Sequence, residues 1–72
     1  MPLLIEYFDI SNLKAFSEAL EKVEELRQAI EVKVVNVELE DSKIKLVLSF
    51  KEEDRDLVFS AFPRAFGLGG VE

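Results

Sequence analysis

Hydrophobic and polar residues alternate over two neighbouring stretches of the chain, residues 32–40 and 43–51. This period of two is typical of β-strands that bury one face. Only Asp41 and Ser42 separate the stretches, so we expect a two-residue turn that joins them as an antiparallel hairpin. The turn is the weak point, because Asp-Ser is less suited to positive φ than Asn-Gly. The register pairs Glu40 with Lys43 and Glu38 with Lys45 on the wet face, and Leu39 with Ile44, Val37 with Leu46 and Val35 with Leu48 on the core face.

Two further elements precede the hairpin. Residues 3–8 are rich in aliphatic and aromatic side chains and predict a short strand, with Leu3, Ile5 and Tyr7 on one face and Leu4, Glu6 and Phe8 on the other. A helix of roughly 18 residues follows, because hydrophobic residues then recur at steps of three and four. Asp9 or Ser11 would cap its first turn. The apolar stripe of this helix comprises Leu13, Phe16, Leu20, Val23, Leu26 and Ile30.

A second helix is predicted after the hairpin. Its first turn is acidic, at residues 52–54, where carboxylates favour the positive end of the helix dipole. Pro63 cannot donate a backbone hydrogen bond and disfavours the helical conformation at Phe62, so the helix should kink or stop there. Residues 66–72 are expected to form a flexible tail.

The order of elements is therefore strand, helix, strand, strand, helix. We predict an α+β fold, βαββα, with a three-stranded antiparallel sheet in the order 2-3-1 and both helices on one face. The first strand would lie at an open edge of the sheet, and exposed edges pair with other chains. The expected dimer edge comprises Leu4, Ile5, Glu6, Tyr7 and Phe8.

Length and charge narrow the function. The 72 residues form a single small domain, residues 1–72, with a thin margin of stability that a partner chain would increase. Lys and Arg number 9 against 15 Asp and Glu, for a net charge of -6. This balance argues against a non-specific binder of nucleic acid or of anionic membranes, and we expect weak or no direct nucleic-acid binding by the isolated chain.

The residue types also limit the chemistry. The chain has no cysteine and no histidine, which removes thiolate metal sites, disulfides and the commonest general base. Acidic clusters such as residues 52–54 could in principle bind Mg²⁺, but consecutive helical residues point in different directions. The carboxylates are instead expected on solvated faces. We predict no catalytic residue, no metal site and no cofactor.

The C-terminal part is unusually rich in phenylalanine. These rings extend beyond what a three-stranded sheet needs to cover it, and exposed apolar patches mark interaction sites. The alternative is that the rings complete a thin core. The residues that we expect to bind a protein partner are Phe59, Phe62, Arg64, Phe66 and Leu68.

The beginning of the chain bears on its location. No apolar run approaches the roughly 20 residues that span a bilayer. The first six residues lack the basic region of a signal peptide and already include Glu6. We therefore expect a cytoplasmic protein. Abundant Glu and Lys with few amides is a composition typical of thermophile proteins.

Several segments, taken together, resemble the small dimerising subunit of the KEOPS complex (the CTAG/Pcc-type family). The similar segments are Ile5-Glu6-Tyr7-Phe8, Ser11 with Ala19-Leu20, Val37 to Ile44, Lys51-Glu52-Glu53-Asp54 and Ser60-Ala61-Phe62-Pro63-Arg64. The likeness extends over nearly the whole chain. In the last segment Arg64 matches the family, whereas Phe62 stands where the family tends to have Tyr and Pro63 where it has Leu. These departures suggest a divergent archaeal paralogue.

The resemblance implies a non-catalytic scaffold that forms a homo- or heterodimer. It would present its helices to the large ATP-dependent KEOPS subunit, which helps to make threonylcarbamoyladenosine in tRNA. A stand-alone ferredoxin-like module that binds a ligand or RNA is the alternative. A small carboxylate-based enzyme or metal protein and a designed sequence are further possibilities, although Pro63 and the irregular Phe-rich end speak against idealised design.

Overall fold

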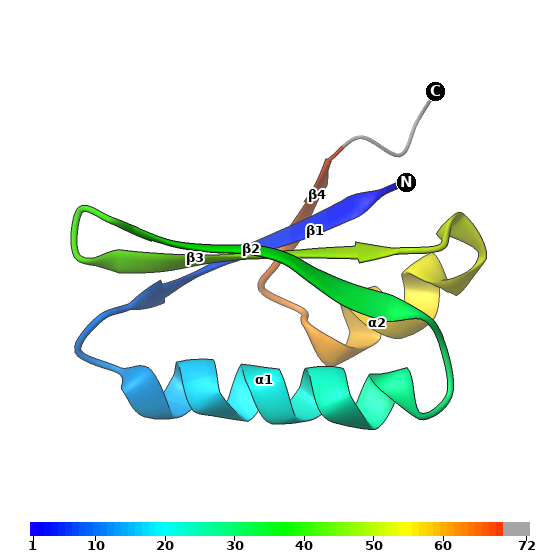
Figure 1. The fold of residues 1–72 in the computed structure, drawn as a ribbon, viewed down its shortest axis with the longest axis horizontal. Helices are drawn as coiled ribbons and strands as arrows, with labels where there is room; N and C mark the ends of the chain where they lie inside the picture. Colours follow the sequence, from blue (N-terminus) through cyan, green and yellow to red (C-terminus); the bar gives the residue numbers. More distant parts are fainter. Residues whose placement is uncertain (69–72) are drawn as a thin grey trace.

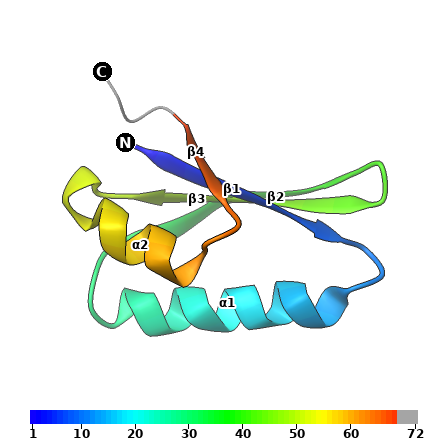
Figure 2. The same cartoon turned by 180° about the vertical axis from the view of Figure 1, so that it is seen from behind.

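A computed structural model describes residues 1–68 as one antiparallel sheet with two helices on the same side of it (Figures 1 and 2). A short 3₁₀ turn, η1, leads into the second helix. The elements in chain order are β1 (Leu3–Asp9), α1 (Leu13–Arg27), β2 (Val32–Glu40), β3 (Lys43–Phe50), η1 (Glu52–Asp54), α2 (Arg55–Ala61) and β4 (Phe66–Leu68).

The sheet has four strands in the order β2-β3-β1-β4, and every neighbouring pair is antiparallel. The predicted α+β class and the β2-β3-β1 order are confirmed, but the prediction of three strands is wrong. The chain turns back after α2 and runs along β1, so that Phe66 lies opposite Ile5 and Leu68 opposite Leu3. The additional strand falls at the start of the segment that we expected to be a flexible tail; residues 69–72 lie outside the described residues.

The β2–β3 hairpin has the predicted register next to its turn, where Leu39 lies opposite Ile44 and Val37 opposite Leu46. The predicted pairing of Val35 with Leu48 is wrong. Val34 takes that position, because the register shifts at a β-bulge between Val34 and Asn36. Two residues of β2 then oppose one of β3, which lets both ends of the strand direct valine side chains toward the helices.

Both turn residues of the hairpin adopt a left-handed backbone, with φ of 48° at Asp41 and 68° at Ser42. This is the conformation of the two-residue turn that matches the twist of paired strands. Non-glycine residues are strained in it, because the side chain approaches the backbone. The Ser42 carbonyl also accepts a hydrogen bond from the Ile10 amide at 2.9 Å, which ties the turn to the end of β1.

The hydrophobic core lies between the sheet and the helices, with β3 at its centre. Helix α1 contributes Ala19 and Val23, and α2 contributes Val58. Phe62 follows the end of α2 at Ala61, as predicted from Pro63, and its side chain turns into the core. The ten core residues are Leu4, Phe8, Ala19, Val23, Val32, Leu46, Leu48, Phe50, Val58 and Phe62.

Helix α1 begins at Leu13, after both residues that were predicted to cap it. Its cap is Asn12, whose side-chain oxygen accepts a hydrogen bond from the Ala15 amide at 3.3 Å. Neither predicted cap acts on the helix, because Asp9 and Ser11 bond to each other in the preceding turn.

Replacing Ser42 by glycine should raise the free energy of unfolding by about 0.5–1 kcal/mol, because glycine adopts a positive φ without the clash of a side chain. Chemical denaturation followed by circular dichroism measures this change. Ser17→Gly is the matched control; Ser17 is exposed within α1, so the same substitution there should destabilise by about 0.5 kcal/mol. A loss of stability in Ser42→Gly would mean that the serine side chain contributes more to the turn than its backbone strain costs.

Candidate functional site

The predicted dimer edge on β1 is already paired over its first half. Residues Leu3–Ile5 lie between β3 on one side and β4 on the other. From Glu6 to Asp9, β3 is the single neighbouring strand among the described residues. Within the predicted set, Leu4, Ile5 and Phe8 are buried, whereas Tyr7 is exposed. The free part of this edge is therefore shorter than the sequence suggested.

The residues predicted to bind a partner divide between the core and the surface. Phe62 is 3% exposed and belongs to the core. Phe59 is half-buried and forms a T-shaped pair with the Phe50 ring, with the centroids 5.8 Å apart. Arg64 and Phe66 are exposed. The side chain of Leu68 lies outside the described residues.

An aromatic pair lies on the outer face of the sheet, opposite the helices. The rings of Tyr7 and Phe66 stack with their centroids 6.2 Å apart. The prediction of a tail at residues 66–72 hid the place of Phe66 on this face. Two of the lysines on the same face have acidic neighbours: Lys43 forms an ion pair with Asp9 at 3.8 Å, and Lys45 lies opposite Glu38.

The longest free edge of the described sheet belongs to β2. This strand runs for nine residues and pairs with β3 alone, whereas the strand at the other edge, β4, has three residues. The predicted strand order, 2-3-1, also places β2 at an edge, so this free edge could have been predicted from the sequence. The sequence-based prediction instead named β1 as the dimer edge, and both faces of that strand are mostly apolar.

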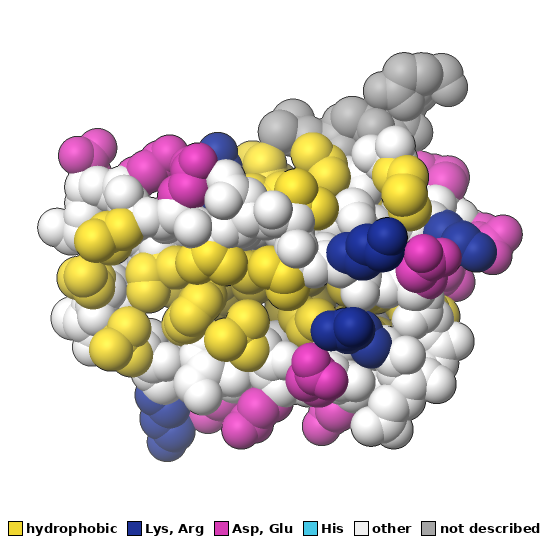
Figure 3. All heavy atoms as spheres, in the orientation of Figure 1, with side chains coloured by type: hydrophobic (Ala, Val, Ile, Leu, Met, Phe, Trp, Pro, Cys, Tyr) yellow, Lys and Arg dark blue, Asp and Glu magenta, His cyan; other side chains and the backbone are white. Residues whose placement is uncertain are grey.

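Large hydrophobic side chains are exposed on the side of β2 that faces α1. Figure 3 shows them as a yellow band between β2 and α1. Three come from β2 and lie on its core face, opposite Leu48, Leu46 and Ile44. We call this set the apolar band; its members and their exposed fractions are Leu13 58%, Leu20 37%, Val34 43%, Val37 47% and Leu39 66%.

The band exists because α1 packs on the middle of the sheet. Ala19 and Val23 point at the core, so that Leu13 and Leu20 fall on the flank of the helix. Val32 at the beginning of β2 is 2% exposed, but the later core-face residues of the strand, Val34, Val37 and Leu39, remain largely uncovered. Three residues of β2 thus have the hydrophobic pattern of a buried strand without the cover that would bury them.

The outer face of β2 carries charge of opposite sign at its two ends. Lys33 lies near the beginning, and Glu38 and Glu40 lie near the end. The Asn36 side chain donates a hydrogen bond to Glu38 at 2.8 Å, and chiefly for this reason the pKa of Glu38 lies below its usual value.

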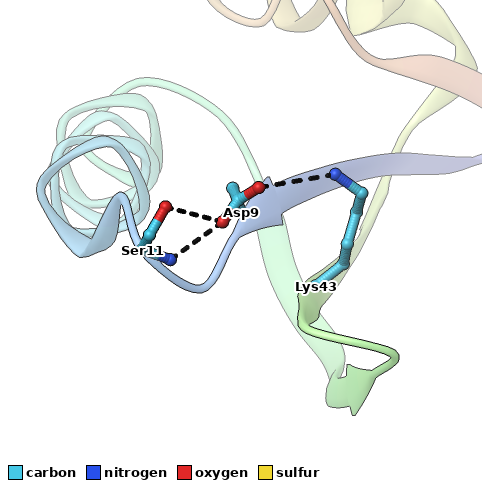
Figure 4. A network of polar contacts seen from close by, with 3 residues as sticks. All are labelled: Asp9, Ser11 and Lys43. Atoms are coloured by element: carbon cyan, nitrogen blue, oxygen red, sulfur yellow. Dashed lines mark hydrogen bonds and ion pairs between the residues drawn. The ribbon is translucent and has the colours of Figure 1, made fainter.

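A polar network holds the connection between β1 and α1 (Figure 4). One carboxylate oxygen of Asp9 accepts hydrogen bonds from the Ser11 amide at 2.9 Å and from the Ser11 hydroxyl at 2.7 Å. These bonds favour the charged form, so the pKa of Asp9 lies below its usual value. The network is exposed, and its role is to shape the turn.

Glu6 lies at a cavity of about 240 Å³ between β1, α1 and the end of α2. Burial raises the pKa of Glu6, although the charges of Lys22 and Arg64 oppose this effect. The Lys22 ammonium donates a hydrogen bond to the Ala61 carbonyl at 3.1 Å and so connects the two helices. Within residues 1–68 no group of acidic side chains is arranged to hold a metal ion, and every buried side-chain polar atom has a partner.

Comparisons with family models, with curated proteins and with solved structures found nothing that matches this chain. Among the described helices, none combines the length and the apolar character needed to cross a bilayer.

Opposite pH dependence is expected for two single variants. Because the pKa of Glu6 is raised in the folded state, its ionisation disfavours folding, and Glu6→Gln should stabilise the chain at pH 7. The gain should vanish as the pH falls below 4.5, where Glu6 is protonated in both states. Asp9→Asn should instead destabilise at pH 7, and this loss should shrink below pH 3.8. Urea unfolding of the two variants and the parent chain measures these changes, over a range from about pH 3 to about pH 7 that brackets the ordinary pKa of both carboxyls. If both variants changed the free energy of unfolding in the same direction, the assigned pKa shifts would be wrong.

Proposed function

We propose that this chain is a non-catalytic protein–protein interaction module, a dimerisation or scaffold subunit of a larger assembly. One observation carries the proposal: the free edge of β2 lies directly beside the apolar band. The edge offers backbone donors and acceptors to another strand, and the band offers hydrophobic surface to whatever accompanies that strand.

The size of the band supports a binding role. Its five side chains expose several hundred Å² of apolar surface, which is the size at which a patch on a small protein marks an interaction site. Covering one half-exposed leucine or valine contributes on the order of 1 kcal/mol. The gain adds to the backbone hydrogen bonds that a strand would form along β2. The two features are adjacent, so a single partner can engage both.

The ionisable groups support a non-catalytic role. The chain has neither histidine nor cysteine. Among the described carboxylates whose pKa is shifted, Glu6 alone is shifted upward. The charges of Lys22 and Arg64 stabilise its carboxylate, and Glu18, the other acidic residue at the cavity, is exposed to solvent, so the two carboxylates do not form the desolvated pair that acid–base chemistry needs.

The alternative of an RNA-binding module gains one supporting observation, the stacked rings of Tyr7 and Phe66 on the open face of the sheet. Exposed aromatic rings are platforms for nucleic-acid bases. Phosphate groups also need cations, and Lys43 and Lys45 are matched by Asp9 and Glu38. With a net charge of -6, we therefore favour a protein partner.

The resemblance to the dimerising KEOPS subunit gives the proposal its most specific form. In that form the chain binds the large ATP-dependent subunit of the complex, and the assembly acts on tRNA. The support is the similarity of sequence segments set out above, together with a β1-α1-β2-β3-α2 order that suits it.

A photoreactive phenylalanine analogue placed at position 39 should form crosslinks to a protein partner in cells of the source organism. Leu39 is 66% exposed, so the substitution leaves the fold intact. The same analogue at position 57, which is 48% exposed on α2, is the matched control. Mass spectrometry identifies the crosslinked chains. Equal yields at the two positions, or none at position 39, would contradict the proposed function.

Mixing the chain with the large KEOPS subunit should give a complex that co-elutes in size-exclusion chromatography. Arg64→Ala should weaken the complex if the matched segment, residues 60–64, takes part, because Arg64 is exposed and its loss spares the core. Separate elution of the unsubstituted proteins would remove the KEOPS form of the proposal and leave the interaction module standing.

A further inference from the structure

We infer that the partner at the β2 edge is a second copy of this chain, which pairs its own β2 antiparallel to the first about a two-fold axis. This inference rests on the proposed function, because it specifies the partner of the same surface. The paired strands would join two four-stranded sheets into one sheet of eight strands, with each β4 at an outer edge.

The geometry of the edge suits such a pair. A two-fold axis perpendicular to the sheet turns one strand antiparallel to its copy and keeps the two faces of the sheet on their original sides. Both copies of α1 therefore lie on the same face, one beside the other. The nine residues of β2 have no other strand along this edge within the described part of the chain. The opposite edge, formed by the three residues of β4, is too short to offer a comparable ladder.

Pairing would bury the apolar band of each copy against that of the other. Val34, Val37 and Leu39 lie along the strand, and Leu13 and Leu20 lie on the adjacent flank of α1. In the two-fold arrangement these sets meet in the space between the helices and the joined sheet. The band contributes several hundred Å² on each copy toward the roughly 800 Å² per partner of a specific interface, and the strand edge adds to it.

Charge on the outer face favours the antiparallel arrangement. Lys33 stands near one end of β2, and Glu38 and Glu40 stand near the other. Antiparallel pairing centred between Val35 and Asn36 places Lys33 of each copy opposite Glu38 of its mate. Pairing centred on Glu38 would oppose that carboxylate to its own copy, which is unfavourable. The charge pattern therefore selects the central register.

The bulge at Val35 is compatible with this pairing. A bulge interrupts a ladder and discourages indiscriminate association at an edge. On β2 it also keeps Val34 and Val37 on the core face on either side of the interruption. An edge that carries one bulge and charges of both signs fits a matched copy better than an arbitrary strand.

Sedimentation equilibrium over a wide concentration range tests the inference, in about 0.15 M salt to screen the repulsion between two acidic chains. The unsubstituted chain should form dimers. Leu39→Lys should raise the dissociation constant by about tenfold or more, because it places an ammonium group in the joined band. Leu57→Lys, on exposed α2, should leave it unchanged. Both substitutions reduce the negative net charge equally, so a general charge effect cannot explain a difference between them. Circular dichroism checks that both variants fold.

Charge exchange tests the register. Lys33→Glu and Glu38→Lys, each alone, should weaken the dimer by about two- to fivefold, as expected for exposed ion pairs. The double variant should recover the affinity, because each copy then presents the same pattern with the signs reversed. If the double variant instead lost as much binding free energy as the two single variants combined, the antiparallel central register would be wrong.

The outcomes separate this inference from the proposed function. Crosslinks at position 39 between two copies of the chain, with dimers that Leu39→Lys dissociates, support both. A chain that stays monomeric throughout, but crosslinks at position 39 to a different protein, overturns the second copy and keeps the interaction module. A dimer that Leu39→Lys and Leu57→Lys leave equally stable overturns the assignment to β2.

Discussion

The packing of α1 on the middle of the sheet determines which hydrophobic side chains of this chain are buried. Ala19 and Val23 contact the core, and the rest of the structure follows from that choice of helix face. The short α2 covers the other flank through Val58, and Phe62 closes the end. Beyond Val32, nothing within residues 1–68 buries the core face of β2, so Val37 and Leu39 have the pattern of buried residues and yet are exposed. The candidate site is thus a direct consequence of how two helices of unequal length share one sheet.

Local patterns predicted those parts of the fold that local chemistry decides. The register near the hairpin turn follows from alternating charges and aliphatic residues, and a slip by one residue would have reversed both faces. The end of α2 follows from Pro63. The bulge could not be predicted, because Val34 and Val35 are both valine and the alternation reads equally well in either register. Strand β4 escaped for a different reason: Phe66, Gly67 and Leu68 are too few to form a recognisable strand, and their pairing with β1 is a long-range contact.

The candidate site was predictable in kind but not in place. Sequence reasoning expected an open sheet edge and an apolar patch, and the structure contains both. The first half of the predicted β1 edge is paired with β4. Of the phenylalanines that were predicted to bind a partner, Phe62 lies in the core and Phe66 is exposed on the outer face of the sheet. Periodicity cannot distinguish an apolar residue that faces the domain's own helix from one that lies beyond the helix's reach. Leu13 and Val23 belong to the same stripe, and yet their exposed fractions are 58% and 2%.

Small size gives the exposed band a thermodynamic consequence. A domain of this length buries a modest share of its surface, and its free energy of unfolding is a small difference between large terms. A partner that binds the folded chain shifts the folding equilibrium by mass action. The band therefore links folding to association: the leucines and valines that α1 leaves uncovered stabilise the chain once another surface covers them.

The other edge of the sheet depends on a glycine. A Cβ at position 67 would lie 3.0 Å from the Phe59 ring, so glycine there lets β4 pass this ring and pair with β1. This pairing covers one edge of the described sheet, whereas the edge of β2 stays open.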